Sequence, residues 1–309
     1  MGTVDLATTL CGMRLDPPIL LASGVLGETG PSLLSAIEGG AGGVVTKSIC
    51  LQPREGHPNP TVVEMEGSGS LLNAMGLPNP GANAFAEELA WLRPRTERPI
   101  VVSVFGGSPE EYAEVASRLA GWADAVELNL SCPHAKGLGA EIGSDPAALE
   151  QVVRAVVRAV KVPVLAKLTP GTHDVPGLAR GAERAGAAGI VAVNTLRAMA
   201  VDVEMRAPAL ANTYGGLSGA ALRPVGVRCV HEVASAVKIP VVGVGGVAAP
   251  ADALEYFMAG ATAVEVGTAV WQGGPGVFRS IADGLRAWLE AHGHSSISEV
   301  QGILVGARR

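Results

Sequence analysis

Eight short apolar segments recur along the chain, each rich in valine, isoleucine or leucine. Uninterrupted apolar runs of this length are typical of parallel strands that are buried on both faces. We predict strands over residues 18–24, 42–48, 99–106, 125–131, 162–169, 189–195, 239–246 and 263–269.

Amphipathic segments alternate with these runs and predict helices. Residues 145–160 open with aspartate and proline, which fit the cap and the first position of a helix. Residues 109–122 carry proline and two acids in their first turn, another signal of a helix start. The predicted helices span residues 109–122, 145–160, 175–187, 223–237, 249–260 and 274–293.

This alternation predicts an α/β fold, a (β/α)8 TIM barrel. A doubly wound open sheet is the alternative, but no GxGxxG fingerprint follows the first predicted strand. Residues 4–18 predict an N-terminal β-hairpin with a turn near Cys11 and Gly12, which we expect to close the bottom of the barrel. We see no linker, so we expect residues 1–309 to form a single domain.

Three strand-to-helix connections are long, at residues 49–83, 132–145 and 196–222. Long loops on the C-terminal face of a barrel usually form lids or substrate walls. We therefore expect these loops to form a lid over that face.

Composition excludes several classes of function. The net charge is −6 and the chain has no block of lysine and arginine, so we expect neither nucleic acid nor a membrane as partner. The first residues show no basic region followed by an apolar core, so we predict no signal peptide. Cys11, Cys50, Cys132 and Cys229 form no CxxC or Cys/His cluster, so no metal site is predicted and a cytoplasmic location is expected.

Two of the five lysines lie in apolar strands near their C-terminal ends, where barrels carry their active sites. A buried lysine is costly unless its charge is paired. Lys47 and Lys167 could each pair with a core carboxylate, such as Glu127 or Glu265. Because both lie on one rim, we favour anionic ligands.

Glycines at the ends of the last two strands, in "VGVGG" and "EVGTA", predict a phosphate cup. The alternative is that glycine is common in this chain, which has 41. The loop "NAMGLPNPG" supplies amide and backbone donors after the second strand, although such residues also form ordinary surface turns.

The motifs "ASG", "TKS", "NAMGLPNPG", "NLSCPH", "AKLTP", "VNT", "GGLSG", "GVGG" and "VGTA" occur in order over nearly the whole chain. Together they resemble the dihydroorotate dehydrogenases. The resemblance implies an FMN-binding (β/α)8 barrel that oxidises (S)-dihydroorotate to orotate in pyrimidine biosynthesis.

The resemblance also implies roles for individual residues. Cys132 would be the catalytic base, and Lys167 would lie near N1 of the flavin. FMN would be contacted by Ser23, Lys47, Ser48, Ser103, Asn129, Lys167, Val193, Gly219, Gly245, Gly246, Gly267 and Thr268. The pyrimidine would be contacted by Lys47, Asn73, Ala74, Met75, Gly76, Leu77, Asn129, Asn194 and Thr195.

Two positions depart from the family pattern. Ser103 stands where relatives typically have asparagine beside the flavin, which puts one hydrogen bond in doubt. His134 replaces the usual asparagine after "SCP", where the lid loop begins.

The segment "HAKGLGAEIGSDP" resembles the NAD+-linked form, whose catalytic subunits pair with an electron-transfer subunit carrying FAD and a [2Fe–2S] cluster. That form implies a homodimeric core within a heterotetramer. The membrane-associated branch has an N-terminal extension and a serine base, which this sequence lacks.

The chemistry is consistent with a flavin, because oxidation of dihydroorotate removes a hydride from C6 and no side chain accepts one. The alternatives are a fumarate-coupled homodimer and a flavin-free phosphate-sugar isomerase or aldolase. A role in binding alone is the least favoured.

Overall fold

The computed structural model describes residues 4–130 and 145–306. Eight parallel strands close into a barrel, and their order around it follows the chain. Each lies within one of the eight predicted segments, so the predicted barrel is confirmed. The barrel strands are β3 (Ile19–Leu21), β4 (Gly43–Val45), β7 (Ile100–Val104), β8 (Ala125–Asn129), β9 (Val164–Leu168), β10 (Gly189–Ala192), β15 (Val241–Val244) and β16 (Ala263–Val266).

Helices surround the barrel. The six predicted helices are present. The predicted cap at Asp145 is confirmed at the N-terminus of α4, where its side chain accepts a backbone N–H group, and Ser108 does the same at α3. The α-helices are α1 (Gly30–Glu38), α2 (Ala82–Leu92), α3 (Pro109–Leu119), α4 (Pro146–Ala159), α5 (Val175–Ala185), α6 (Arg223–Ala234), α7 (Pro250–Ala259), α8 (Thr268–Gly273) and α9 (Val277–Ala291). Short 3-10 helices are η1 (Arg93–Arg95), η2 (Ala120–Trp122), η4 (Ala220–Leu222) and η5 (Ile297–Glu299).

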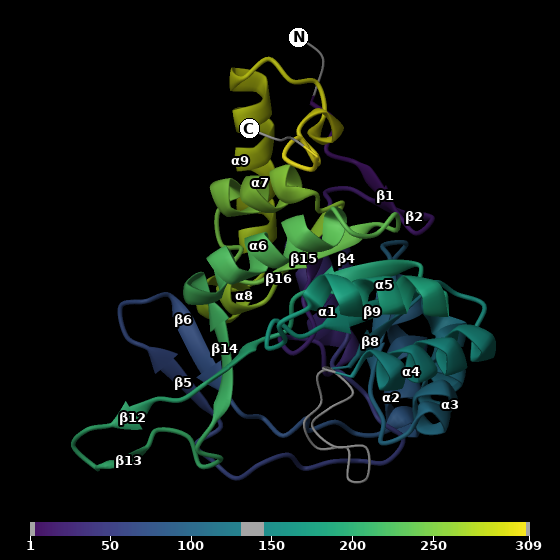
Figure 1. Ribbon diagram of the computed structural model, residues 1–309, viewed down its shortest axis with the longest axis vertical. Helices are drawn as coiled ribbons and strands as arrows, with labels where there is room; N and C mark the ends of the chain where they lie inside the picture. Colours follow the sequence, from purple (N-terminus) through teal and green to yellow (C-terminus); the bar gives the residue numbers. More distant parts are fainter. Residues whose placement is uncertain (1–3, 131–144, 307–309) are drawn as a thin grey trace.

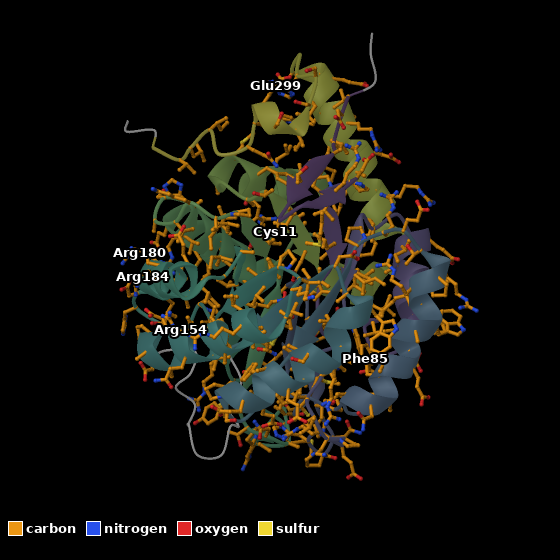
Figure 2. The ribbon with its side chains drawn as sticks, turned by 90° about the vertical axis from the view of Figure 1, so that its right-hand side faces the viewer. Cys11, Phe85, Arg154, Arg180, Arg184 and Glu299 are labelled. Carbon is orange, nitrogen blue, oxygen red and sulfur yellow. The ribbon has the colours of Figure 1, made fainter. Side chains whose placement is uncertain are left out.

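Three of these α-helices, α1, α2 and α8, were not predicted. α1 begins with glycine, proline and serine, which favour a turn, and its helical start is marked by the cap at Thr29. α2 is rich in alanine and follows glycine in a segment of loop composition, but it buries Phe85 against the core (Figure 2). α8 is a short helix whose first two residues lie within the predicted strand at residues 263–269.

The predicted N-terminal hairpin is present and closes the bottom of the barrel. β1 (Thr8–Leu10) and β2 (Met13–Leu15) pair antiparallel around a turn at Cys11 and Gly12, both of which have positive φ. Leu10 and Leu15 are fully buried and pack with inward-facing residues of the barrel strands. The hairpin therefore plugs this end of the barrel. A functional site is expected at the opposite rim, where the barrel strands end.

Two of the three long connections pair with each other in a second sheet, which was not predicted. Its order is β11-β14-β6-β5 and its pairs are antiparallel. A further short pair, β12 and β13, forms an arm that projects from the body (Figure 1). The strands of these connections are β5 (Val62–Met65), β6 (Ser70–Asn73), β11 (Leu196–Ala198), β12 (Val201–Asp202), β13 (Ala207–Pro208) and β14 (Gly215–Gly219). The third long connection lies outside the described residues, apart from its last position.

The outer faces of the helices carry exposed ion pairs. Arg154 of α4 and Arg184 of α5 both contact Glu150, and they lie on one side of the molecule with Arg180 (Figure 2). Exposed pairs of this kind contribute about 0–1 kcal/mol each. The apolar core, rather than this surface, therefore holds the fold together. Within the described part of the chain, no helix is long and apolar enough to cross a membrane.

Candidate active site

The interior of the barrel changes from apolar to polar toward the C-terminal ends of the strands. Alternate residues of a strand face the interior, so a residue two positions after an inward-facing one faces inward as well. Ala125 and Leu165 belong to the apolar layer above the hairpin plug. Two positions further along the same strands stand Glu127 and Lys167. Asn129, a further two positions on, reaches the rim.

Serine and asparagine side chains form a hydrogen-bonded network across this rim. The hydroxyl groups of Ser48 and Ser103 are 2.9 Å apart, and Asn129 Nδ2 donates to Ser48 Oγ at 3.0 Å. Asn194 Nδ2 donates in turn to Asn129 Oδ1 at 3.2 Å, and Ser23 Oγ lies 3.4 Å from Ser48 Oγ. Five residues from five separate stretches of the chain are thus brought together. The serine at position 103, where an amide was expected, is linked to Ser48.

Lys47 lies at the same rim and is almost fully buried, with 4% of its side chain exposed. Its Nζ is 3.0 Å from Oε1 of Glu28, whose own side chain is 60% exposed. An exposed carboxylate is a weakly held partner, since water competes for it. The lysine is therefore available to an anionic ligand that displaces or joins Glu28. Glu28 is not among the predicted site residues, because its one signal in the sequence is an acid in the loop after the first barrel strand.

Lys167 is paired within the barrel interior. Its Nζ is 2.8 Å from Glu265 Oε2 and 3.4 Å from Glu127 Oε2, and all three side chains are buried. Burial alone would lower the pKa of Lys167, but the two carboxylates outweigh it and hold that pKa above its ordinary value. Lys167 is thus paired with core carboxylates, which is the less favoured of the two predictions for this lysine.

Three glycines with positive φ meet where β14, β15 and α6 come together: Gly219, Gly245 and Gly246. A Cβ on Gly219 would lie 2.4 Å from the carbonyl oxygen of Gly69, and one on Gly246 would lie 2.5 Å from that of Gly219. The chain segments approach so closely that no side chain fits between them. Beside them, Gly267 caps α8, and Thr268 Oγ1 donates to Ser218 Oγ at 2.9 Å.

The loop from Asn73 to Leu77 is held at both sides. Asn73 Nδ2 donates to the carbonyl of Gly216 at 3.2 Å, and the carbonyl of Met75 accepts from the backbone of His57 at 3.0 Å. Ala74, Met75, Gly76 and Leu77 are half-buried. The segment is therefore a fixed wall that joins the second sheet, and its turn-like composition reflects the positive φ of Gly76 and Leu77.

The remaining predicted rim residues follow β10. Val193 is buried and its N–H donates to the carbonyl of Val244 at 3.1 Å. The N–H of Thr195 donates to Oδ1 of Asn194 at 2.8 Å, which orients that amide. Cys132 and His134 lie outside the described residues.

The other cysteines have the features of structural thiols. Burial raises the pKa of Cys11 to about 11, and it also raises the pKa of Cys50 and of Cys229. A raised pKa keeps a thiol in its unreactive protonated form. Among residues 4–130 and 145–306 no group of His, Cys, Asp or Glu side chains could hold a metal ion.

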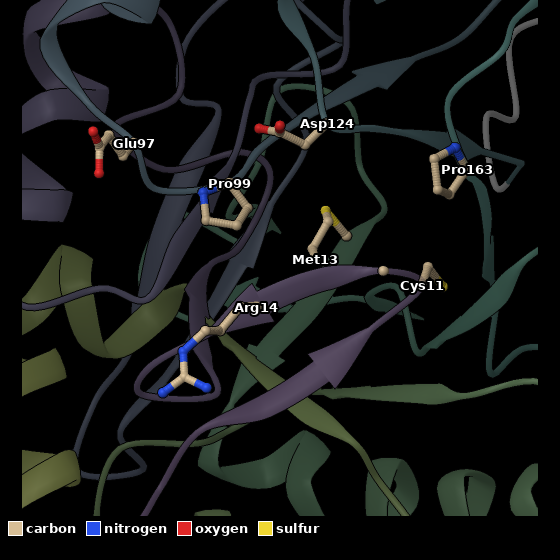
Figure 3. A pocket seen from close by; sticks show the side chains of 8 residues that line it. Cys11, Met13, Arg14, Glu97, Pro99, Asp124 and Pro163 are labelled. Carbon is tan, nitrogen blue, oxygen red and sulfur yellow. The ribbon is translucent and has the colours of Figure 1, made fainter.

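A surface depression of about 430 Å³ lies at the opposite end of the barrel, beside the hairpin turn (Figure 3). Cys11, Met13 and Arg14 of the hairpin line it, together with Glu97 and Asp124. It contains none of the rim residues described above, and active sites of these barrels form at the other face. We therefore place the candidate site at the polar rim.

Comparisons with known proteins agree with the motifs of the sequence. The family model described as dihydroorotate dehydrogenase matches residues 5–289. A relative from Pyrococcus furiosus is 49% identical over 294 residues, covering 95% of this chain and 97% of the relative. Relatives from Methanosarcina mazei (49%, covering 96% and 94%) and Methanocaldococcus jannaschii (44%, covering 98% and 99%) are also similar. All three are named dihydroorotate dehydrogenase B (NAD(+)), catalytic subunit.

Proposed function

Because this chain belongs to the dihydroorotate dehydrogenase family, we propose that it oxidises (S)-dihydroorotate to orotate in pyrimidine biosynthesis, with a bound flavin as hydride acceptor. The observation that carries the proposal is the convergence of the rim residues. Ser48, Asn129 and Asn194 come from distant segments and are joined by hydrogen bonds next to buried Lys47. A planar ligand edged with donors and acceptors is what such amides recognise, because an amide donates and accepts at once.

The flavin supplies the one function that no side chain has, acceptance of a hydride. We propose FMN, since the residues fit its phosphate end. Gly219 and Gly246 leave no room for side chains, and all three glycines have positive φ near Thr268, which suits close approach of a phosphate to the backbone. The full set proposed to hold FMN is Ser23, Lys47, Ser48, Ser103, Asn129, Lys167, Val193, Gly219, Gly245, Gly246, Gly267 and Thr268.

The substrate is proposed to lie between this set and the wall formed by residues 73–77. Lys47 would bind the carboxylate of the substrate, and Asn73, Asn129, Asn194 and Thr195 would hold the ring. Exclusion of water by a closed wall strengthens each of these polar contacts.

Cys132 is proposed as the base that removes the proton from C5. A thiol has an ordinary pKa of about 8.5, so only a small fraction is thiolate at neutral pH unless its surroundings favour ionisation. The positive charge of Lys47 would favour the thiolate. We therefore expect turnover to rise with pH as the thiol ionises.

We propose that the electrons leave through a partner subunit to NAD+. The relatives are named catalytic subunits and their names give NAD+. The family resemblance adds that the partner carries FAD and a [2Fe–2S] cluster, that two catalytic subunits form the core of a heterotetramer, and that the assembly is cytoplasmic.

The experiment compares electron acceptors. The purified chain with dihydroorotate is expected to reduce an artificial dye, and to reduce NAD+ only when the partner is added. Reduction of fumarate by the chain alone, at a rate equal to that with the dye, would favour the fumarate-coupled form instead. Failure to reduce any acceptor would contradict the proposed function.

Substitution of Gly246 tests the proposed phosphate end. Gly246→Ala places a Cβ at positive φ and against the carbonyl of Gly219, so we expect FMN binding to weaken by roughly tenfold or more, which corresponds to about 1.4 kcal/mol. Riboflavin, which lacks the phosphate, should be affected less. Titration of the apoprotein with each flavin measures both.

Gly274→Ala is the matched control, because Gly274 also has positive φ (+73°) but no atom within 4 Å of an added Cβ. It should share the backbone strain and keep its FMN affinity. Equal FMN affinities in the two variants would argue against a phosphate at Gly246.

A further inference from the structure

Three charged side chains lie together in the barrel interior, one layer below the rim. Glu127 of β8, Lys167 of β9 and Glu265 of β16 are at most 6% exposed. The ammonium group of Lys167 contacts both carboxyl groups, at 2.8 Å for Glu265 and 3.4 Å for Glu127. We call these three residues the buried triad. The proposed chemistry uses the lysine and gives the carboxyl groups no role.

The charges of the buried triad do not balance if every group is ionised, because two carboxylates face one ammonium. Two carboxylates around one ammonium at a buried site cannot both stay ionised without a large cost, and such pairs share a proton. Burial raises the pKa of Glu265 to about 8, against the opposing effect of Lys167, and the negative charge of Glu127 adds to the rise. Two carboxyl groups around one buried ammonium therefore favour a single proton on the carboxyl pair.

Nothing else in the described chain balances the triad. The groups that shift the pKa of Lys167 are Glu127 and Glu265, and those that shift the pKa of Glu265 are Lys167 and Glu127. Lys47, the other lysine of the rim, is paired with Glu28. The strand residues in register with the triad are uncharged: Leu20, Ser103, Asn129, Leu165, Val191 and Val244.

We propose that Glu127 and Glu265 are positioning residues that share a single proton, hold the Lys167 ammonium in place beneath the cofactor site, and take up or release that proton when the charge of the bound flavin changes. The last part rests on the proposed function. Reduction of a flavin adds negative charge, which favours a protonated triad; the proton comes from water and returns to it on reoxidation.

The shared proton has a consequence for stability that does not depend on any cofactor. Between the ordinary pKa of a glutamate and about 8, the folded chain keeps on Glu265 a proton that the unfolded chain has lost. The folded state then binds more protons, so this group's contribution to stability falls as pH rises through that window. Glu265→Gln removes the contribution while keeping the size and hydrogen bonding of the side chain.

We expect the melting temperature of Glu265→Gln, relative to the unmodified protein, to rise from about pH 5 to about pH 8 and to level off above. Near neutral pH, Glu127→Gln should also be tolerated, because one carboxylate still pairs with Lys167. The double variant leaves the lysine without a counter-charge, so its loss of stability should exceed the sum of the single losses. Glu97→Gln, at an exposed position, is the matched control. Its melting temperature relative to the unmodified protein should not change with pH.

A pH-independent difference between Glu265→Gln and the unmodified protein would overturn the shared proton, and so would a loss in either single variant as large as in the double variant. If the double variant does not fold, the pH dependence of the melting temperature of the single variants still tests the shared proton.

The link to the flavin has its own readout, the midpoint potential of bound FMN as a function of pH. In the unmodified protein the potential should fall more steeply over the pH range in which the triad titrates, since reduction there takes up one additional proton. Both single variants should lose this steeper segment, and Glu97→Gln should keep it. Its persistence in Glu265→Gln would overturn the coupling, while a protein that binds no flavin would contradict the proposed function and leave the stability experiment to judge the triad.

Discussion

Replacing Cys132 with serine is expected to lower the turnover of dihydroorotate by about 10²- to 10⁴-fold, the usual contribution of a general base. A serine hydroxyl ionises far less readily than a thiol, so it removes the C5 proton poorly at neutral pH. The variant should still bind the flavin and orotate, because the change is one atom. Steady-state turnover, together with the visible spectrum and an orotate titration, separates the loss of chemistry from a loss of binding.

Cys11→Ser is the matched control for this experiment. Cys11 lies in the turn of the hairpin plug, where its Sγ donates to the carbonyl of Ala188 at 3.1 Å, far from the rim. Its turnover should match that of the unmodified protein. Normal turnover in Cys132→Ser, or a rate that does not change with pH while chemistry is rate-limiting, would show that another group is the base.

Replacing Lys47 with methionine is the change with the second largest expected effect. It keeps the apolar stem and removes the charge proposed to bind the substrate carboxylate. Loss of a hydrogen bond to a charged group costs about 1.5–3 kcal/mol, which corresponds to roughly 10- to 150-fold weaker orotate binding. We also expect the pH dependence of turnover to move upward, since the thiolate of Cys132 loses a nearby positive charge.

Two further variants identify the partner of Lys47. Lys161→Met removes an exposed lysine far from the rim and should leave orotate binding unchanged. Glu28→Gln removes the exposed carboxylate that contacts Lys47, so orotate binding should be equal or tighter. If orotate binds Lys47→Met as tightly as the unmodified protein, the carboxylate is held elsewhere.

The barrel could be predicted because its strands are short, buried on both faces and separated by well-capped helices. The hairpin plug followed from the same pattern, with Cys11 and Gly12 marking its turn. The second sheet could not be predicted, since strands such as β14, "GGLSG", carry no apolar alternation. They form because two connections more than a hundred residues apart pair with each other, as in the register of Gly216 with Asn73.

The candidate site also has a part that could be predicted from the sequence and a part that could not. Residues at strand ends, such as Ser48 and Asn129, could be placed at one rim because parallel strands end together. The buried triad was harder to predict. Lys167 has two glutamate partners, 40 and 98 residues away, and the sequence favoured an anionic ligand over this ion pair. The period of two that carries Glu127 and Glu265 inward is visible in the sequence, but their contact depends on the closure of the barrel.

The visible spectrum of the purified protein, recorded without oxygen before and after addition of dihydroorotate, tests the central claim most directly. We expect a flavin absorbance that bleaches on addition of dihydroorotate and returns when an electron acceptor is supplied. A protein that stays colourless after incubation with FMN, or whose bound flavin keeps its absorbance in the presence of dihydroorotate, would contradict the account.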